Sequence, residues 1–245
     1  MQLKDKVVLL TGASSGLGAH FGPVLHDAGA HVVLVARRAE RLAEVAAGLT
    51  RVSQEVVDVR DEEAMTATVR RVVDEHGRID VLVNNAGIWE HGPGESESTD
   101  QFRRVIETNL IALFSVTRIV AANMLARGSG SVVNISSINS LIGVDESPAS
   151  YSASKAGVNG LTMLLASQWG RRGVRVNAIA PGPFPSELND YFGNPDDVAK
   201  WGPRTAMSRI GEPDELDGLL LYLAGDASSY VTGQVISVDG GWSVI

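Results

Sequence analysis

A tyrosine and a lysine four residues apart are the side chains in this sequence best suited to proton transfer. They are Tyr151 and Lys155, in the segment Tyr-Ser-Ala-Ser-Lys. On a helix, residues four apart lie on one face, so the phenol and the ammonium would project into the same space. A phenol titrates near ~10 in water, and a neighbouring ammonium favours the phenolate. The pair therefore suits general acid or base catalysis near neutral pH.

Composition excludes several other chemistries. The 245 residues contain no linker-like or low-complexity run, which predicts one α/β domain over residues 1–245. The net charge of −8 and the scattered arginines argue against a nucleic-acid partner. The sequence has no cysteine and five histidines without metal-ligand spacing, so we expect no thiol chemistry and no metal site.

The polarity of the chain predicts a cytoplasmic protein without a membrane partner. Residues 1–6 lead straight into an apolar strand, without the apolar core of a signal peptide. The apolar stretch from Leu110 to Leu125 is interrupted by Ser115, Thr117 and Arg118, which makes it too polar and too short to span a bilayer.

A glycine-rich loop follows the first expected strand. The apolar run 7–10 is typical of a parallel strand buried on both faces, and a helical segment up to Gly29 comes after the loop. Such a loop lets the backbone approach a pyrophosphate, whose charge is met by the N–H groups at the helix N-terminus. The loop spacing is Gly-x-x-x-Gly-x-Gly, and the residues expected to bind a dinucleotide are Gly12, Ser14, Ser15, Gly16, Leu17 and Gly18.

The end of the second expected strand, residues 31–35, indicates which dinucleotide is bound. An acidic residue at this position would accept hydrogen bonds from the ribose of NAD, whereas the 2′-phosphate of NADP needs cations. Here Ala36 is followed by Arg37 and Arg38. These residues favour NADP(H), with NAD(H) as the alternative; the two arginines would otherwise simply begin the polar face of the next helix.

Further short apolar runs at 55–57, 80–83, 131–135, 174–179 and 235–238 alternate with helical segments. This alternation predicts a doubly wound parallel sheet of seven strands with helices on both faces. Ligands of such sheets bind beyond the carboxyl ends of the strands. Residues expected at those ends are Asp58, Val59, Asn85, Ala86, Gly87, Ser136, Ser137, Pro181, Gly182, Phe184 and Ser186.

A long helix is expected after the cluster Ser98-Thr99-Asp100, which offers an N-cap. Asn109 falls on the apolar side of this helix. A buried asparagine needs hydrogen-bond partners, so Asn109 either bonds the helix backbone or bends the helix and holds a water.

In combination these motifs are far more specific than any one alone. Over its whole length the sequence resembles the short-chain dehydrogenase/reductase family. The resemblance implies a Rossmann-type sheet, a nicotinamide cofactor and hydride transfer between a carbonyl and an alcohol. The matching features are Thr11 to Gly18, Asn84 to Gly87, Asn109, Ser137, Tyr151 with Lys155, Pro181-Gly182 and Val238-Asp239-Gly240-Gly241.

The same resemblance implies roles for individual residues. Tyr151 would be the general acid for reduction or the base for oxidation, and Ser137 would hydrogen-bond the substrate oxygen. Lys155 would bind the nicotinamide ribose and lower the pKa of Tyr151. Asn109 would hold a water on a proton relay to Lys155, and Ser186 stands where the family usually has a threonine that contacts the carboxamide.

One departure concerns the substrate wall. The interval from Ser137 to Tyr151 is one residue longer than is usual in the family, so an extra residue within 143–150 would reshape the wall. Ser136 and Ser140 are alternatives for the role of Ser137. Asp145 and Glu146 would place negative charge beside the pocket.

The substrate stays open among several classes. Ketones with secondary alcohols lead, and the alternatives are 3-oxoacyl thioesters, sugars or polyols, and bulky hydrophobic ketones. An acidic acyl-carrier protein would need a cationic landing surface, to which Arg127, Arg171 and Arg172 would contribute. A protein of a different class, a non-catalytic NADP(H)-sensing partner protein, would be expected to lack part of the catalytic set.

Two larger features complete the expectations. The segment from about 184 to 210 carries Phe184, Tyr191, Phe192 and Trp201, which indicates an aromatic lid over the substrate or, alternatively, a hydrophobic anchor or subunit contact. The family resemblance implies a homotetramer, with a homodimer as the alternative, in which the helices from about Thr99 and Tyr151 pack across a twofold interface.

Overall fold

The computed structural model describes residues 2–90, 92–145, 147–185 and 195–245. They form a seven-stranded parallel sheet in the order β3-β2-β1-β4-β5-β6-β7. The strand order reverses between β1 and β4, so the ends of these two strands form the switch point where ligands bind in such sheets. The strands are β1 Val7–Thr11, β2 His31–Ala36, β3 Val52–Val56, β4 Val81–Asn84, β5 Gly130–Ile135, β6 Val174–Pro181 and β7 Val235–Val238.

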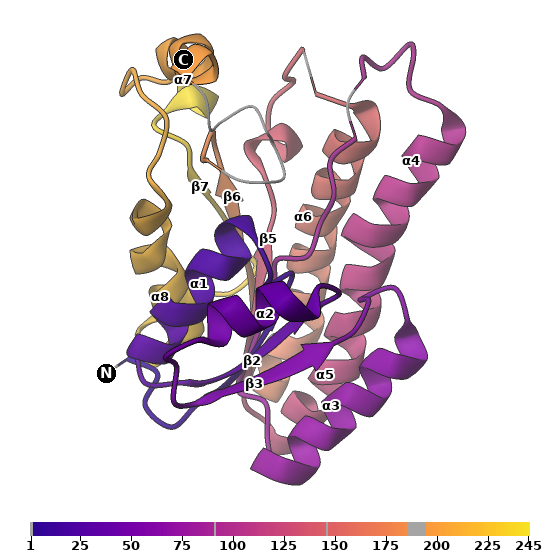
Figure 1. Cartoon of the computed structure of the whole chain (residues 1–245), viewed down its shortest axis with the longest axis vertical. Coiled ribbons are helices and arrows are strands. Elements are labelled where there is room, and N and C mark those ends of the chain that lie inside the picture. The colour runs from indigo at the N-terminus through magenta and orange to yellow at the C-terminus, as the bar shows by residue number, and fades with distance from the viewer. Residues whose placement is uncertain (1, 91, 146, 186–194) are drawn as a thin grey trace.

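Helices cover both faces of the sheet (Figure 1). The main helices are α1 Gly16–Asp27, α2 Ala39–Ala46, α3 Glu62–His76, α4 Thr99–Ile106, α5 Leu113–Arg127, α6 Ala149–Trp169, α7 Pro195–Trp201 and α8 Asp217–Ala224. A π-helical segment, Glu107–Ala112, joins α4 to α5. The expected doubly wound architecture is confirmed.

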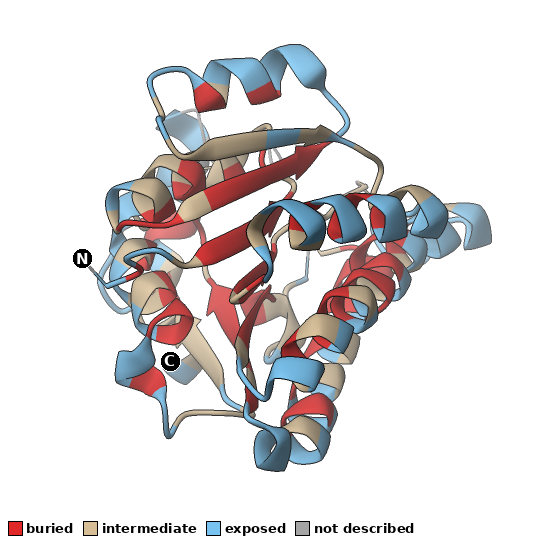
Figure 2. Ribbon diagram, turned by 90° about the horizontal axis from the view of Figure 1, so that it is seen from below, coloured by how far each residue is buried: buried red, intermediate tan, exposed pale blue. Residues whose placement is uncertain are grey.

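Two apolar cores lie on opposite faces of the sheet, as the buried residues in Figure 2 show. Val8 and Leu10 of β1 pack into the core beneath α1, α2 and α8, whereas Val7 and Leu9 pack into the core beneath α3, α5 and α6. Successive side chains of a strand point to opposite faces. A strand buried on both faces is therefore apolar throughout.

The edge strand β3 begins earlier than the sequence predicts. It pairs only with β2 in the described sheet and starts at Val52, three residues before the expected run 55–57. Its residues are half-buried or exposed, and Ser53, Gln54 and Glu55 are polar. The hydrophobic pattern misses the strand because an edge position needs less apolar surface.

The helix that carries Asn109 runs without a break from Thr99 to Arg127. It begins with the expected Ser98 cap, completed by a capping box with Gln101. Among the described residues, this 29-residue segment, which contains an 18-residue stretch of mean hydropathy 1.6, is the one helix long and apolar enough to cross a membrane. The sequence-based expectation considered only 110–125 and judged it too short. A core helix meets the same criterion, and Val116 and Val120 are buried in the core against the sheet.

Candidate active site

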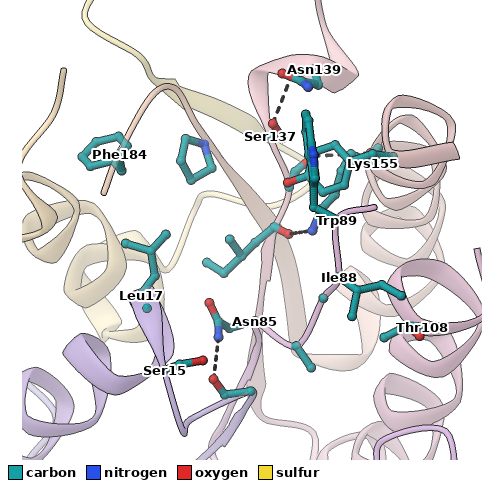
Figure 3. Close-up of a pocket in the computed structure, with 18 of the residues that line it drawn as sticks. Ser15, Leu17, Asn85, Ile88, Trp89, Thr108, Ser137, Asn139, Lys155 and Phe184 are labelled. Carbon is teal, nitrogen blue, oxygen red and sulfur yellow. Dashed lines mark hydrogen bonds between the residues drawn. The ribbon is translucent and has the colours of Figure 1, made fainter. Parts of the chain in front are cut away.

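One cavity of about 640 Å³ opens at the carboxyl ends of β1, β4, β5 and β6 (Figure 3). It gathers most of the residues that the sequence singled out. Gly18 and Asn109 do not line it but lie behind lining residues, and Ser186 falls outside the described residues. Those that line it are Gly12, Ser14, Ser15, Gly16, Leu17, Arg37, Arg38, Asp58, Val59, Asn85, Ala86, Gly87, Ser137, Tyr151, Lys155, Pro181, Gly182 and Phe184.

The glycine loop is packed tightly against the end of β4. Gly12 has a φ of +66°, and a Cβ there would lie 2.7 Å from the Cα of Ala86. A Cβ on Gly18 would lie 2.1 Å from the carbonyl oxygen of Gly12. The Asn85 amide donates to the carbonyl oxygens of Thr11, at 3.2 Å, and Gly12, at 3.1 Å. Only residues without a Cβ let the chain adopt this shape.

Helix α1 presents its N-terminus at this loop. Its N-cap residue, Ser15, makes no side-chain cap hydrogen bond in the described structure, and the first turn has no acidic residue. The first N–H groups of a helix lack partners within the helix and carry partial positive charge. The site therefore fits a pyrophosphate group, as the sequence predicts.

Three arginines surround the far end of the cavity. Arg38 Nε donates to Ser14 Oγ at 3.3 Å, and Arg37 Nη1 lies 3.9 Å from Asp58 Oδ2. Arg60, which the sequence analysis missed, donates to Asp58 Oδ2 at 2.6 Å, and this hydrogen bond is the largest cause that lowers the Asp58 pKa. Three guanidinium groups and one carboxylate line this end, which suits an anionic ligand.

Tyr151 and Lys155 lie on one face of α6 and are both buried, as their spacing predicts. Lys155 Nζ lies 5.6 Å from the centroid of the Tyr151 ring and donates to the carbonyl oxygen of Ile135 at 2.8 Å. A hydrogen bond from the Ser137 hydroxyl stabilises the ionised form of Tyr151. The three side chains therefore converge beyond the end of β5.

Burial controls the protonation of this pair. It raises the pKa of Tyr151 to about 12, although the Ser137 hydrogen bond acts to lower it. Burial lowers the pKa of Lys155 to about 8. Desolvation of the phenolate therefore dominates in this arrangement, and the expectation that Lys155 depresses the Tyr151 pKa stays a prediction. At pH 7 Tyr151 carries its proton and can donate it.

The neighbouring serines are engaged elsewhere. Ser136 Oγ donates to Asn159 Oδ1 at 2.7 Å, and Ser140 Oγ donates to the carbonyl oxygen of Ser137. Of the three candidate serines, Ser137 is the one whose hydroxyl bonds Tyr151.

Asn109 stabilises the loop after β4. Its Oδ1 accepts from the Ile88 N–H at 2.8 Å, and its Nδ2 donates to the Ile88 carbonyl oxygen at 2.9 Å. A Cβ on Gly87 would lie 3.3 Å from Asn109 Oδ1 and 3.7 Å from Lys155 Nζ, so both side chains adjoin the same backbone. The Asn109 side chain therefore bonds Ile88 in the loop after β4, and not the backbone of its own helix. The π-helical turn that holds Asn109 is a local departure from the α-helix, and such turns often occur at functional sites.

Comparison with known proteins decides the family. The family model described as enoyl-(acyl carrier protein) reductase matches residues 12–243. The 3-oxoacyl-[acyl-carrier-protein] reductase of Thermotoga maritima is 38% identical, over 98% of this chain and 99% of its own. The chain belongs to the short-chain dehydrogenase/reductase family. As such it is an oxidoreductase that acts on CH–OH or C=O groups with a nicotinamide cofactor.

Other short-chain dehydrogenases/reductases are equally similar. The gluconate 5-dehydrogenase of Gluconobacter oxydans is 38% identical over 96% of this chain and 94% of its own. A solved gluconate 5-dehydrogenase from Burkholderia cenocepacia, in complex with NADP and tartrate, has a TM-score of 0.93 and 34% identity, with 100% of this chain and 97% of that chain covered. Relatives of different substrate class match equally well, so similarity does not name the substrate.

The substrate side of this short-chain dehydrogenase/reductase contains residues that the sequence analysis did not single out. They include Trp89, Asn139, Val144 and Trp242, and all of them line the cavity. Trp89 could have been predicted at the cavity, because it stands two residues after Gly87, which the sequence places at the carboxyl end of a strand. Trp242 offered none, because only the return of the chain after β7 brings it to the cavity.

The segment from 184 to 210 and the interval from Ser137 to Tyr151 both contribute lining residues to this side. Val144 and Asp145 line the cavity from within 143–150, and the reshaping of the wall stays a prediction. Phe184 and Trp201 are buried and also line the cavity. Glu146, Tyr191 and Phe192 lie outside the described residues.

Proposed function

We propose that this protein interconverts a ketone and a secondary alcohol with NADP(H), and that residues 1–245 act as one catalytic domain. The observation that carries the proposal is the meeting of Ser137, Tyr151 and Lys155 with the glycine loop in a single cavity. When bound, the nicotinamide supplies a hydride to the carbonyl carbon, or accepts it back from the alcohol.

Ser137 and Tyr151 act on the substrate oxygen. As the carbonyl is reduced, negative charge develops on its oxygen, and two donors fixed in advance stabilise that charge by a few kcal/mol each, as an order of magnitude. Tyr151 also transfers its phenolic proton to this oxygen, which completes the alcohol. In oxidation Tyr151 takes up the alcohol proton.

Lys155 supports Tyr151 from the cofactor side. It lies beside Gly87 and donates to Ile135, so its remaining N–H groups would hold the nicotinamide ribose. Asn109, which holds the loop at Ile88, is proposed to position a water between the solvent and Lys155. Such a relay would return a proton to Tyr151 after each reduction.

NADP(H) is proposed over NAD(H) because of the cations at the far end of the cavity. Arg37 and Arg38 follow β2 where an NAD enzyme would carry an acid. Ser14, which Arg38 contacts, adds a hydroxyl beside them. Guanidinium groups bind phosphate by paired, charge-assisted hydrogen bonds.

A small ketone is favoured over a substrate carried by an acyl-carrier protein. The arginines suggested as a landing surface, Arg127, Arg171 and Arg172, stand before β5 and β6, at the amino ends of these strands. Tyr151 lies at the other end of α6, and Trp169 is roughly 27 Å from it along the helix axis. Cations at that end of the sheet would not hold a carrier at the mouth of the cavity.

The segment from about 184 to 210 is proposed as a lid over the substrate. Within its described part, Arg204 Nη1 contacts Asp145 Oδ1 at 3.1 Å and so ties the segment to the loop before α6. Residues 186–194, which include Ser186, lie outside the described residues. A lid that closes the cavity would exclude water from the reaction.

We also propose that the protein acts in the cytoplasm as a homotetramer. Ile111 and Phe114, near the start of α5, and Met163 and Leu164 of α6 are exposed large apolar side chains. Contiguous exposed apolar surface marks contact sites between proteins. A second copy packed on these helices would bury it.

The test is the initial rate of NADPH oxidation over a panel of ketones, with NADH and the Tyr151→Phe variant run beside it. We expect turnover with NADPH well above that with NADH. We expect Tyr151→Phe to bind NADPH with nearly unchanged affinity and to lose turnover. If NADPH binds and no ketone or alcohol reacts, the catalytic proposal fails in favour of an NADP(H)-sensing protein.

A further inference from the structure

Trp89 lies against the catalytic tyrosine. The centroids of the Trp89 and Tyr151 rings are 4.6 Å apart, and the ring planes are inclined at 59°. Both side chains line the cavity, and Figure 3 shows Trp89 beside Ser137 and Lys155. A substrate whose oxygen reaches Tyr151 therefore also meets the indole of Trp89.

The loop holds Trp89 between two anchors. On one side, Ile88 exchanges two hydrogen bonds with the Asn109 amide. On the other, Glu90 accepts from Arg104 Nε at 2.9 Å and from Arg104 Nη2 at 2.7 Å. Both partners belong to the continuous helix 99–127, so the loop on each side of the indole is fixed before any substrate arrives. A wall set in advance costs little ordering entropy on binding.

Two more indoles line the same cavity. The rings of Trp201 and Trp242 lie 5.4 Å apart and are inclined at 38°, and both residues line the cavity. Three of the four tryptophans of the chain therefore border this one space. Flat, rigid aromatic side chains bury large apolar areas and pack best against another ring.

Polar side chains on the substrate side are already bonded within the protein. Asn139 Nδ2 donates to Ser147 Oγ at 2.6 Å, and Asp145 pairs with Arg204. A substrate with many hydroxyl groups would have to break such bonds or bury hydroxyls without partners, and either carries a cost in free energy.

We propose that the substrate carries its carbonyl or alcohol on or beside an apolar ring that packs against Trp89, and that Trp89 selects this class over polyhydroxylated substrates. The inference rests on the proposed function and names the substrate class of the same site. The carbonyl oxygen lies at Ser137 and Tyr151, and the ring lies against the indole.

The experiment compares kcat/KM for three probes with NADPH: a substituted cyclohexanone, fructose as a polyhydroxy ketone with its kcat/KM referred to the open-chain fraction that carries the free carbonyl, and a 3-oxobutanoyl thioester. We expect the cyclohexanone to be the best substrate of the unmodified enzyme. Trp89→Ala should lower its kcat/KM about tenfold or more, mostly through KM, because a lost apolar contact is worth about 10- to 200-fold. Trp89→Phe should recover most of this loss, and the value for fructose should fall less.

The control is Trp169→Phe, which changes an indole packed against the core at the far end of α6 from Tyr151, where it does not line the cavity. It should leave the ratio between the three probes unchanged. Melting temperature and NADPH affinity, measured for every variant, show whether each folds and binds cofactor.

Several outcomes overturn the inference. It fails if fructose or the thioester is preferred, or if Trp89→Ala lowers kcat/KM equally for all three probes. Those results would leave the proposed function standing, because ketones would still be reduced. If folded, NADPH-binding enzyme turns over no ketone and no alcohol, the proposed function itself fails and the substrate class fails with it.

Discussion

The Glu97 carboxylate caps the helix that carries Tyr151 through two hydrogen bonds from Ser150. Its Oε2 accepts from the backbone N–H of Ser150 at 3.1 Å, and its Oε1 accepts from the Ser150 hydroxyl. Helix α6 begins at Ala149, and its N-cap residue, Pro148, supplies no side-chain cap. Glu97 thus provides the cap from 53 residues away in the sequence. The residue that it binds, Ser150, immediately precedes Tyr151.

Removal of this cap should affect both stability and catalysis. We expect Glu97→Ala to lower the free energy of unfolding by about 1 kcal/mol, as the loss of an N-cap does, and to reduce kcat more than it raises KM. Glu97→Gln keeps the acceptor oxygen and should recover most of kcat. Chemical denaturation and steady-state kinetics provide the measurements, and a Glu97→Ala enzyme with unchanged kcat would show that the cap does not position Tyr151.

Lys155 should make stability depend on pH. Its pKa is about 8 in the folded protein and 10.5 as the ordinary value, so between these pH values the unfolded state binds more protons. The free energy of unfolding should therefore rise with pH over this window, by up to about 3 kcal/mol. Below pH 8 both states are protonated and this dependence vanishes.

The measurement compares the enzyme with Lys155→Met by chemical denaturation from pH 7 to pH 10. Subtracting the free energy of unfolding of Lys155→Met from that of the unmodified enzyme cancels the titrations of all groups that the two proteins share. Tyr151, whose folded pKa is about 12, opposes the rise only above about pH 10, where it ionises in the unfolded state first. A difference that stays flat across the window would mean that Lys155 is not desolvated.

The glycine loop should not tolerate a methyl group at Gly18. The Cβ of Gly18→Ala would lie 2.1 Å from the Gly12 carbonyl oxygen and 2.5 Å from the Asn85 amide nitrogen, so the loop must shift. We expect NADPH affinity to fall at least tenfold and the melting temperature to drop. Gly218→Ala is the matched control, because a Cβ at Gly218 meets nothing within 4 Å and α8 should gain slightly from alanine.

Arg38 should discriminate between the two cofactors. Loss of a charge-assisted hydrogen bond costs about 1.5–3 kcal/mol, so Arg38→Ala should raise the Kd for NADPH by about tenfold or more and leave that for NADH nearly unchanged. Arg41, which pairs with Glu44 outside the cavity, provides the control variant Arg41→Ala. Equal weakening of both cofactors would argue against a 2′-phosphate contact.

The exposed apolar side chain of Leu164 should be required for assembly. A charge on an interface that excludes water is costly, so Leu164→Glu should shift a tetramer toward smaller species. Light scattering after size exclusion gives the mass of each species. Val56→Glu, at an equally exposed valine on the edge strand β3, should leave the mass unchanged; a Leu164→Glu protein with unchanged mass would place the interface elsewhere.

Local pattern determined much of this protein. The apolar runs of the central strands, the glycine loop after β1 and the pairing of Tyr151 with Lys155 all depend on residues close together in the chain. Their meaning follows from strand and helix periodicity and from backbone freedom at glycine. Since parallel strands end at one edge of a sheet, the sequence alone also predicted which residues would meet there.

The tertiary structure decided what depends on burial and on distant partners. The direction of the Tyr151 pKa follows from desolvation, which no spacing reveals. The cap from Glu97, the bonds of Asn109 to Ile88 and the contact of Trp89 with Tyr151 join separate segments of the chain. Such contacts exist only once packing has fixed where each segment lies, because side-chain hydrogen bonds and ring contacts act over a few ångströms.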